Sequence, residues 1–437
     1  MSCKNKTMSK RKKESKTINR YIVLICCAVC GGLTGAIFMW SIFRNPLMEA
    51  NGWDAGTVTF AYSFFEIMAL VSCLMCGWLM RRVKASTLCA ISGFGFALGW
   101  FLTGYAHEVW QLYLFFSVIA GFSDGFVYNA CITVVQKWFP DKRGMAVGVC
   151  AGAMGLAPLL FAPLGTMFIE TYDVFTAFKL CGIIFLVVRV VFGLGVKEAP
   201  DGYLPAGYTP SEEELVVKGT NVTTRDMFKQ PVFYLLWVIL LFGDVSGLML
   251  TSQAAAIATN MVGLTAAQGT ALVAIMAVAS FSGRFGFGTL SDKIGRFQTL
   301  GIVMVMFIVA MGILFPRVNS FPMFIVAIVM VGFAYGSIMA IMPSIVSDVF
   351  GTKHFGMNWG IFFGAFTAAS FIGPMAAATI ETSTGSFVPA FYFAAALAVV
   401  GLALLPIAAK ANKHFEQRKL SGEFSDSSEK AEAKAAA

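Results

Sequence analysis

Ser282–Arg296, with the sequence Ser-Gly-Arg-Phe-Gly-Phe-Gly-Thr-Leu-Ser-Asp-Lys-Ile-Gly-Arg, is the stretch that decides the expected fold. It places Arg284 inside a long apolar segment and ends that segment in a polar turn. A charge inside bilayer hydrocarbon costs several kcal/mol, so it is retained where it faces a cavity or pairs with an acid. A guanidinium is also the preferred partner of a carboxylate. We therefore interpret Arg284 as a ligand-binding residue and the turn as a conformational motif.

The composition of the whole chain supports a membrane environment for this stretch. Apolar residues make up 57% of the 437 residues and charged residues 13%, against ~25% charged residues in ordinary soluble domains. A soluble fold cannot bury that much apolar surface, because its exterior must be mostly polar. Lipid is therefore the expected solvent of the outer surface, and only helices or closed barrels satisfy their backbone groups there.

Twelve apolar segments approach or exceed the ~20 residues that a helix needs to cross a bilayer. The sequence predicts an all-α membrane protein with 12 transmembrane helices in two six-helix halves, 21–196 and 232–409. Residues 1–20 form a basic leader, 197–231 a Pro- and Gly-rich linker, and 410–437 a tail expected to be disordered. The expected spans are 21–43, 57–80, 87–105, 111–135, 144–169, 175–196, 232–255, 268–289, 298–315, 322–346, 357–380 and 388–409.

The positions of the basic residues predict the orientation of the chain. The two termini and the even-numbered loops hold 27 of the 32 lysines and arginines. Cytosolic loops of membrane proteins carry such an excess, so we expect a multi-pass plasma-membrane protein with both termini cytosolic. The net charge of +8 then belongs to a membrane face and gives no reason to expect a nucleic-acid partner.

Motifs for metal, redox or nucleotide chemistry are weak in this sequence. The pairs Cys27/Cys30 and Cys73/Cys76 have C-x-x-C spacing, but no histidine accompanies either pair, so we interpret them as helix-packing residues. The sequence has no G-x-x-x-x-G-K-[ST] loop, which leaves an ATP-driven pump unsupported. We expect no cofactor, no metal site and no enzymatic activity.

A weak internal repeat relates the two halves. Gly77–Lys84 stands 211 residues before Gly288–Gly295, at the end of the second span of each half. Carriers with two parallel halves show such repeats, and their substrate site lies between the halves near the bilayer midplane. The motif residues are Gly77, Arg81, Gly288, Asp292, Lys293, Gly295 and Arg296.

The second copy of this turn resembles the signature loop of the major facilitator superfamily. The first copy departs from it, because Arg81 stands where that family has aspartate, so we expect the two halves to latch differently. Lys137–Gly144, Met342–Gly351, Asn358–Gly360 and the Pro-Asp-Gly-Tyr-Leu-Pro-Ala-Gly linker further resemble the oxalate/formate antiporter family, which is close to the monocarboxylate carriers. The resemblance implies a secondary carrier with alternating access.

The resemblance also implies a set of substrate-binding residues. Arg284 matches a carboxylate-binding arginine, and Tyr128 and Tyr335 match site aromatics; Trp40 and Phe363 are similar candidates. The family's oxalate carriers have a second cation, a lysine, at the place held here by Phe366. One cation suits a monoanion, so we expect a monocarboxylate such as formate or lactate rather than oxalate.

Three acids within the spans, Glu66, Asp124 and Asp244, are candidates for proton coupling. An acid inside a membrane is usually paired or protonated. The alternative for each acid is therefore a structural role, in a hydrogen bond between helices. Asp244 is expected to face Arg284. Lys179 and Arg189 lie near opposite ends of one span, and we expect them to reach toward the interfaces.

The sequence thus predicts a monomeric carrier in a lipid bilayer that moves a small organic anion, by exchange for a counter-anion or with a proton. Two alternatives remain open. One is a carrier of a neutral or amphiphilic solute. The other is a non-transporting membrane sensor, which would be expected to carry a signalling domain.

Overall fold

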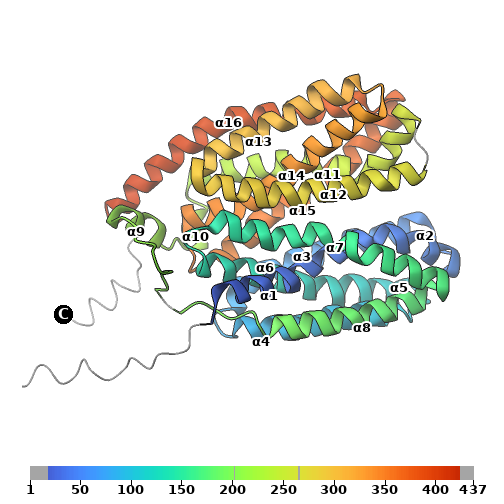
Figure 1. The fold of residues 1–437 in the computed structure, drawn as a ribbon, viewed down its shortest axis with the longest axis horizontal. Coiled ribbons are helices and arrows are strands. Elements are labelled where there is room, and N and C mark those ends of the chain that lie inside the picture. Colours follow the sequence, from blue (N-terminus) through green and yellow to red (C-terminus); the bar gives the residue numbers. More distant parts are fainter. Residues whose placement is uncertain (1–17, 201, 264–265, 424–437) are drawn as a thin grey trace, which may run out of the picture.

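The protein consists of two helical bundles that lie side by side with their long axes roughly parallel (Figure 1). The computed structural model describes residues 18–200, 202–263 and 266–423, and every regular element in these ranges is helical. The described chain begins and ends at the same end of the molecule, which we call the terminal end (Figure 1). The opposite end, near α2 and α5, is the far end.

The amino-terminal half contains the helices from α1 to α8. Its first span bends through a 3₁₀ segment, η1, where an ideal Cβ at Gly35 would overlap the Met154 carbonyl of α7, so only glycine allows this approach. Its fourth span contains a π-helical segment, η2. The elements are α1 (Arg20–Gly32), η1 (Leu33–Met39), α2 (Trp40–Asn51), α3 (Ala55–Leu79), α4 (Ala85–Thr103), α5 (Val109–Leu112), η2 (Tyr113–Gly121), α6 (Phe122–Trp138), α7 (Arg143–Thr171) and α8 (Val174–Gly193).

The carboxyl-terminal half contains six long helical spans and is joined to the first half by a segment with two short helices. These are α9 (Glu212–Gly219) and α10 (Thr224–Met227). The long elements are α11 (Pro231–Val262), α12 (Ala266–Ile294), α13 (Arg296–Val309) with η3 (Ala310–Leu314) and η4 (Phe315–Arg317), α14 (Phe321–Phe350), α15 (Phe355–Thr384) and α16 (Val388–Leu420).

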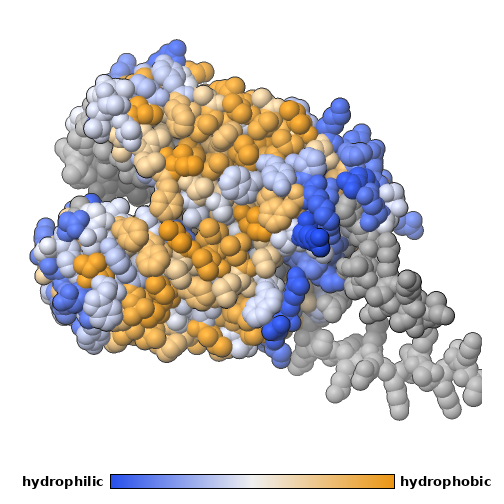
Figure 2. All heavy atoms as spheres, turned by 180° about the vertical axis from the view of Figure 1, so that it is seen from behind, coloured by the Kyte–Doolittle hydropathy of each residue, from blue (hydrophilic) through white to orange (hydrophobic). Residues whose placement is uncertain are grey.

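Eleven helical segments within the described residues are long and apolar enough to cross a membrane. The remaining expected span, 268–289, lies in α12, a helix of 29 residues that carries Arg284. Large apolar side chains on the outer surface, such as Leu160, Met375 and Ile91, are 65–68% exposed. On the face shown in Figure 2, a broad apolar band lies between more polar ends. Water would penalise this surface and lipid would not, so the expected all-α membrane fold is confirmed.

Several expected boundaries differ from the structure; the first and seventh spans, for example, continue to Asn51 and Val262, past the expected ends at 43 and 255. The linker contains α9, which begins where the Ser211 hydroxyl accepts a hydrogen bond from the Glu214 amide. A hydrogen bond from Lys218 lowers the pKa of the Glu214 carboxyl. The last span continues to Leu420, past the expected end at 409, because the Lys419 ammonium donates to the carbonyls of Val217 and Val349. Residues 1–17 of the expected leader and 424–437 of the expected tail lie outside the described residues.

The two halves contact each other mainly through two helix pairs, α7 with α12 and α3 with α15, and further through α7 with α14 and α6 with α15. Both main contacts are made by glycines near the terminal end. An ideal Cβ at Gly77 would lie 2.2 Å from the Met357 amide nitrogen, and one at Gly288 would lie 2.4 Å from the Gly144 carbonyl oxygen. Backbones approach this closely only where both surfaces lack side chains. The terminal end is therefore closed between the halves.

Candidate functional site

Arg284 is buried in the centre of the contact between α12 and α7. Its residue is 2% exposed, and a row of α7 glycines provides the space for it. An ideal Cβ at Gly155 would lie 2.2 Å from the Arg284 Nη1, and one at Gly148 would lie 2.3 Å from the Arg284 carbonyl oxygen. Any side chain at these glycines would displace the guanidinium or the helix, so α7 fixes the position of Arg284.

Three polar residues from three other helices surround the guanidinium. Tyr335 of α14 presents its ring 5.7 Å from the Arg284 Cζ. Tyr128 of α6 and Asp244 of α11 also interact with it electrostatically. Asp244 is fully buried, and Tyr128 and Tyr335 are 2% and 5% exposed. The structure thus places four of the predicted residues within electrostatic range of one another, although Asp244 and Arg284 form no direct hydrogen bond or ion pair.

This group has unused hydrogen-bonding capacity. The Arg284 Nε and Nη1, the hydroxyls of Tyr128 and Tyr335, and both carboxylate oxygens of Asp244 bond to no described residue. Buried polar groups nearly always have partners, and each unsatisfied group needs an explanation. Donors and acceptors that converge without bonding each other are suited to an anion and its proton.

Aromatic side chains of α15 form the wall of this region. The Tyr128 and Phe363 rings lie 5.7 Å apart between centroids, and Phe363 stacks on Phe366 at 5.0 Å. These three residues line a small cavity together with Glu66 and Asp124. Phe363 and Phe366 therefore lie beside Tyr128, one residue of the polar group.

Trp40 lies elsewhere. Its ring stacks on Phe116 at 4.1 Å and contacts Phe178 at 6.5 Å, within an aromatic cluster of the amino-terminal half. It does not line the small cavity formed by the other candidates. The structure gives Trp40 a packing environment.

Arg189 does not reach an interface, and that prediction is wrong. The residue is fully buried, and its Nη2 pairs with the Asp124 carboxylate at 2.5 Å and donates to the Thr34 hydroxyl at 3.2 Å. Its Cζ also lies 3.9 Å from the centroid of the Phe96 ring. Burial without a partner would be costly for either charge, whereas the pair compensates both. Lys179, by contrast, is half-buried with its ammonium over the Tyr105 ring.

Asp292 joins the halves at the terminal end on the side of α7 and α12. Its carboxylate accepts hydrogen bonds from the Gly144 and Met145 amides, both at 2.9 Å, in the first turn of α7. A carboxylate at a helix N-terminus satisfies unpaired amides and complements the helix dipole. Arg296 pairs with Asp292 at 2.7 Å, while Lys293 of the same motif is exposed.

Arg81 occupies the corresponding place on the side of α3 and α15. Its Nη2 lies 2.6 Å from the Nδ1 of His354, the N-cap residue of α15. A hydrogen bond from Asn129 to the Gly356 carbonyl, at 2.7 Å, also joins the halves here. The structure therefore shows different contacts at the two copies of the motif, as the Arg81 departure led us to expect.

Arg143, Asp348 and Gly155 were not singled out from the sequence, and the partner of Arg296 was not foreseen. Arg143 and Arg296 both bind the Asp348 carboxylate, at 2.6 and 2.9 Å, and so connect α7, α13 and α14. Arg143 and Asp348 lie within the two motifs that carry the family resemblance, and this was the available signal. Gly155 had no comparable signal, because its role depends on the position of another helix.

The model described as Major Facilitator Superfamily matches residues 24–316 and 245–434. The chain therefore belongs to the major facilitator superfamily and is a multi-pass membrane transporter rather than an enzyme. Within the family it is similar to the oxalate:formate antiporter of Oxalobacter formigenes, with 28% identity over 367 residues, 84% of this chain and 85% of the relative.

Two further relatives support this placement. The uncharacterized MFS-type transporter YhjX of Escherichia coli (strain K12) is 28% identical over 352 residues, 80% of this chain and 86% of the relative. Monocarboxylate transporter 12 of Rattus norvegicus is 20% identical over 375 residues, 80% and 77% of the two chains. Within the superfamily, the chain is thus similar to an oxalate:formate antiporter and to a monocarboxylate transporter.

Solved structures agree on the fold. The human organic anion transporter MFSD10 (TETRAN) has a TM-score of 0.71 at 15% identity, covering 89% of this chain and all of that chain. The proton:xylose symporter XylE has a TM-score of 0.69 at 11% identity, covering 88% and 94% of the two chains. At such identities the likeness concerns the fold alone.

Proposed function

We propose that this protein is a secondary active transporter of small organic anions, and that it prefers a monocarboxylate such as formate or lactate to oxalate. The observation that carries the proposal is the buried Arg284 guanidinium, whose Nε and Nη1 have no hydrogen-bond partner among the described residues. A guanidinium offers parallel N–H donors that match a carboxylate. The hydroxyls of Tyr128 and Tyr335 would complete the coordination of the bound anion.

The preference for a monoanion rests on the charges around the site. Phe366 places a ring where the family's oxalate carriers have a lysine, so Arg284 lacks a second cation on that wall. Arg189 is already neutralised by Asp124. Glu66 also lines the small cavity and would repel the second carboxylate of a dianion. A single carboxylate with an apolar or small remainder therefore fits this environment best.

Asp244 is the favoured group for proton coupling. A fully buried carboxylate without a hydrogen-bond donor must be neutralised by a proton or by a nearby cation. When a substrate carboxylate binds the Arg284 guanidinium, it neutralises the positive charge that stabilises the Asp244 carboxylate. Asp244 would then bind a proton. Asp124 keeps Arg189 as its partner, and Glu66 remains the second candidate. Exchange for a counter-anion is the alternative, in which the second anion replaces the first at Arg284.

Alternating access would follow from motion of residues 21–196 against 232–409, with residues 197–231 as their connection. We place the terminal end, where the described chain begins and ends, at the cytosolic face of the plasma membrane. The contacts of Gly77, Asp292 and Arg143 at this end then close the cytosolic side. Opening of this side would break these contacts while the far end closes. The monomer contains all of the residues that this cycle uses.

The decisive experiment is flux of labelled formate, lactate and oxalate in proteoliposomes, with and without an internal counter-anion. Uptake that requires the internal anion supports exchange, and uptake driven by an imposed pH gradient alone supports proton symport. Arg284→Lys keeps the positive charge but removes the parallel N–H donors of the guanidinium. We expect this variant to lower formate uptake at least about tenfold, because charged hydrogen bonds contribute ~1.5–3 kcal/mol. Arg317→Lys, at an exposed arginine, is the matched control.

Full anion flux in the Arg284→Ala variant would overturn the proposal. Flux of neutral solutes with no anion flux would support the carrier of a neutral or amphiphilic solute. Absence of flux for every solute, with a folded protein, would support the membrane sensor.

A further inference from the structure

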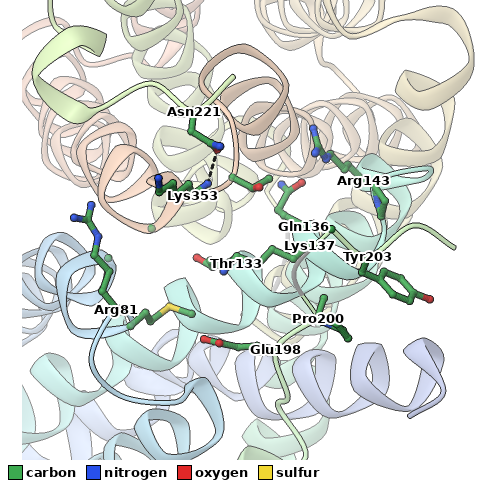
Figure 3. Close-up of a pocket in the computed structure, with 17 residues that line it drawn as sticks. Arg81, Thr133, Gln136, Lys137, Arg143, Glu198, Pro200, Tyr203, Asn221 and Lys353 are labelled. Atoms are coloured by element: carbon green, nitrogen blue, oxygen red, sulfur yellow. Dashed lines mark hydrogen bonds between the residues drawn. The ribbon is translucent and has the colours of Figure 1, made fainter. Parts of the chain in front are cut away.

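The small cavity that Tyr128 lines differs in charge from a larger cavity at the terminal end. The larger cavity, of about 530 Å³, has Arg81 and Lys137 in its wall (Figure 3). No lysine or arginine of the described chain lines the small cavity, whose charged lining residues are Glu66 and Asp124. The small cavity is therefore acidic, unlike the larger one.

Glu66 is the acid of the small cavity that lacks a compensating charge. Asp124 is paired with Arg189. Glu66 is 5% exposed and lines the cavity, and none of the described residues donates a hydrogen bond to its carboxylate or forms an ion pair with it. The neighbouring charge that acts on it is the negative charge of Asp124. A buried carboxylate in this situation has to be neutralised by a proton or by a cation.

Three aromatic rings line the same cavity and favour a cation over a proton. The Tyr128 and Phe363 rings lie 5.7 Å apart between centroids, and Phe363 stacks on Phe366 at 5.0 Å. The faces of aromatic rings attract ammonium groups, and the attraction is stronger where water is excluded. A proton on Glu66 makes no use of these rings, whereas a ligand ammonium group interacts with both the carboxylate and the rings.

Tyr335 connects the acidic cavity with the anion site. Its ring lies 5.7 Å from the Arg284 Cζ, and its side chain is also within electrostatic range of Glu66. Tyr128, which lines the cavity, is likewise within electrostatic range of Arg284. A single small molecule with a carboxylate at one end and a cation at the other matches this arrangement.

We propose that the site also accepts small zwitterionic monocarboxylates, which place the carboxylate at Arg284 and an ammonium group beside Glu66. This inference rests on the proposed binding of a carboxylate by Arg284, and it specifies what the site recognises at the other end of the substrate. An apolar remainder suits the rings, and where the remainder reaches Glu66, a cationic group also neutralises the acid. The ammonium group then replaces the proton that Glu66 otherwise needs.

The buried charges of this region favour the same substrate class. Two cations and three acids give a sum of −1, and they are Arg189, Arg284, Glu66, Asp124 and Asp244. A bound monoanion makes the sum more negative unless a proton accompanies it, whereas a zwitterion leaves the sum unchanged. Since an uncompensated charge is costly in a buried, low-dielectric environment, a zwitterion binds here with the smaller electrostatic penalty.

The test uses pairs of ligands that share a shape and differ in charge. Glycine betaine is compared with tert-butylacetate, and γ-aminobutyrate with valerate. Binding to the full-length protein in neutral detergent is followed as the midpoint of thermal unfolding against ligand concentration, at constant ionic strength. In at least one pair, we expect the zwitterion to bind about tenfold more tightly than its partner, because the ammonium group gains both the Glu66 charge and the rings.

Three variants assign this preference to the cavity. Glu66→Gln keeps the size of the side chain and removes its charge, and the affinity ratio within a pair should fall to about one. Phe366→Leu removes a ring and keeps every charge, and the ratio should fall at least about twofold. Glu170→Gln, at an exposed position of α7, is the matched control and should keep the ratio. Each variant is first required to unfold cooperatively without ligand, and a ratio taken within one variant is unaffected by a general loss of affinity.

A ratio of about one for both pairs in the unaltered chain would overturn the inference, and so would an unchanged ratio in Glu66→Gln. The outcome also separates this inference from the proposed function. If both members of a pair bind equally and Arg284→Ala abolishes the binding of both, the carboxylate anchor stands and only the zwitterion inference fails. If none of the four ligands stabilises the protein, the carboxylate anchor fails and this inference falls with it.

Discussion

The different contacts at the two copies of the motif lead to a specific prediction for Arg81→Asp. Asp292 accepts two amides at the start of α7, and Arg81, 211 residues earlier, faces the start of α15 instead. The two copies of the motif are otherwise placed alike. Gly288, four residues before Asp292, lies against Gly144, and Gly77, four residues before Arg81, lies against the Met357 amide. An aspartate at position 81 is therefore placed to cap α15.

The expected magnitude follows from three contributions. A carboxylate that caps a helix contributes ~1 kcal/mol. Replacing a cation by an anion near a helix N-terminus adds up to ~1 kcal/mol. Loss of the hydrogen bond between Arg81 and His354 costs about 1 kcal/mol. The net stabilisation of the closed terminal end is ~1 kcal/mol, which corresponds to an about fivefold lower open population.

Distance measurement by double electron–electron resonance tests this value. Spin labels are attached to cysteines introduced at Lys84 and Lys413, which are exposed on the two halves. Of the described native cysteines, all except the half-buried Cys26 are buried, which limits background labelling. The Arg81→Asp variant should show more of the short distance and an about fivefold slower anion flux.

Arg82→Asp is the matched control. The neighbouring Arg82 places its Cζ 4.3 Å from the Trp78 ring centroid and is exposed, so the same charge change there has no helix end to cap. If Arg81→Asp and Arg82→Asp give the same distance distribution, or if Arg81→Asp increases the long distance, the capping argument is refuted.

Three further predictions concern the substrate site. Gly155→Ala places a methyl group against the Arg284 guanidinium. We expect an about 5- to 150-fold loss of formate flux, which corresponds to ~1–3 kcal/mol of overpacking. The control is Gly219→Ala, where an added Cβ meets nothing within 4 Å, and it should keep full flux. Asp244→Asn should abolish uptake driven by a pH gradient alone, and unchanged gradient-driven uptake would remove Asp244 from the coupling mechanism. Phe366→Lys should raise the oxalate-to-formate uptake ratio about tenfold, through a second charged hydrogen bond to a dianion, and an unchanged ratio would contradict the charge argument.

The fold was predictable because a membrane-spanning helix is recognised from the hydrophobicity of its own consecutive residues. Apolar segments of bilayer length recur whatever their neighbours, and the polar linker separates two sets of six. The burial of Arg284 inside the protein was predictable for a related reason, since a charge exposed to lipid in such a segment is costly. The ends of the elements were less predictable. The extension of α16 to Leu420 depends on Lys419 meeting carbonyls of α9 and α14, and such contacts leave no local pattern.

The pairing inside the site was predictable only in part. Arg189 and Asp124 are 65 residues apart and meet because α6 and α8 bring them together, while span position alone suggested an interfacial arginine. The site aromatics Tyr128 and Tyr335 came from family resemblance, since 42 phenylalanines, 11 tyrosines and 8 tryptophans give no individual ring a local signal. Trp40 shows the limit of that reasoning, because its neighbours are Phe116 and Phe178.

The glycine row of α7 has a consequence for how the substrate range of this transporter can change. Gly148 and Gly155 contact the backbone and the guanidinium of Arg284, so a larger residue there would displace one or the other and disturb the proposed anion site. The opposite wall consists of side chains, from Asp244 on α11 to Phe363 and Phe366 on α15, which can be exchanged without moving a backbone. Laboratory evolution toward larger or more highly charged acids should therefore accumulate substitutions on α11 and α15 and leave α7 unchanged.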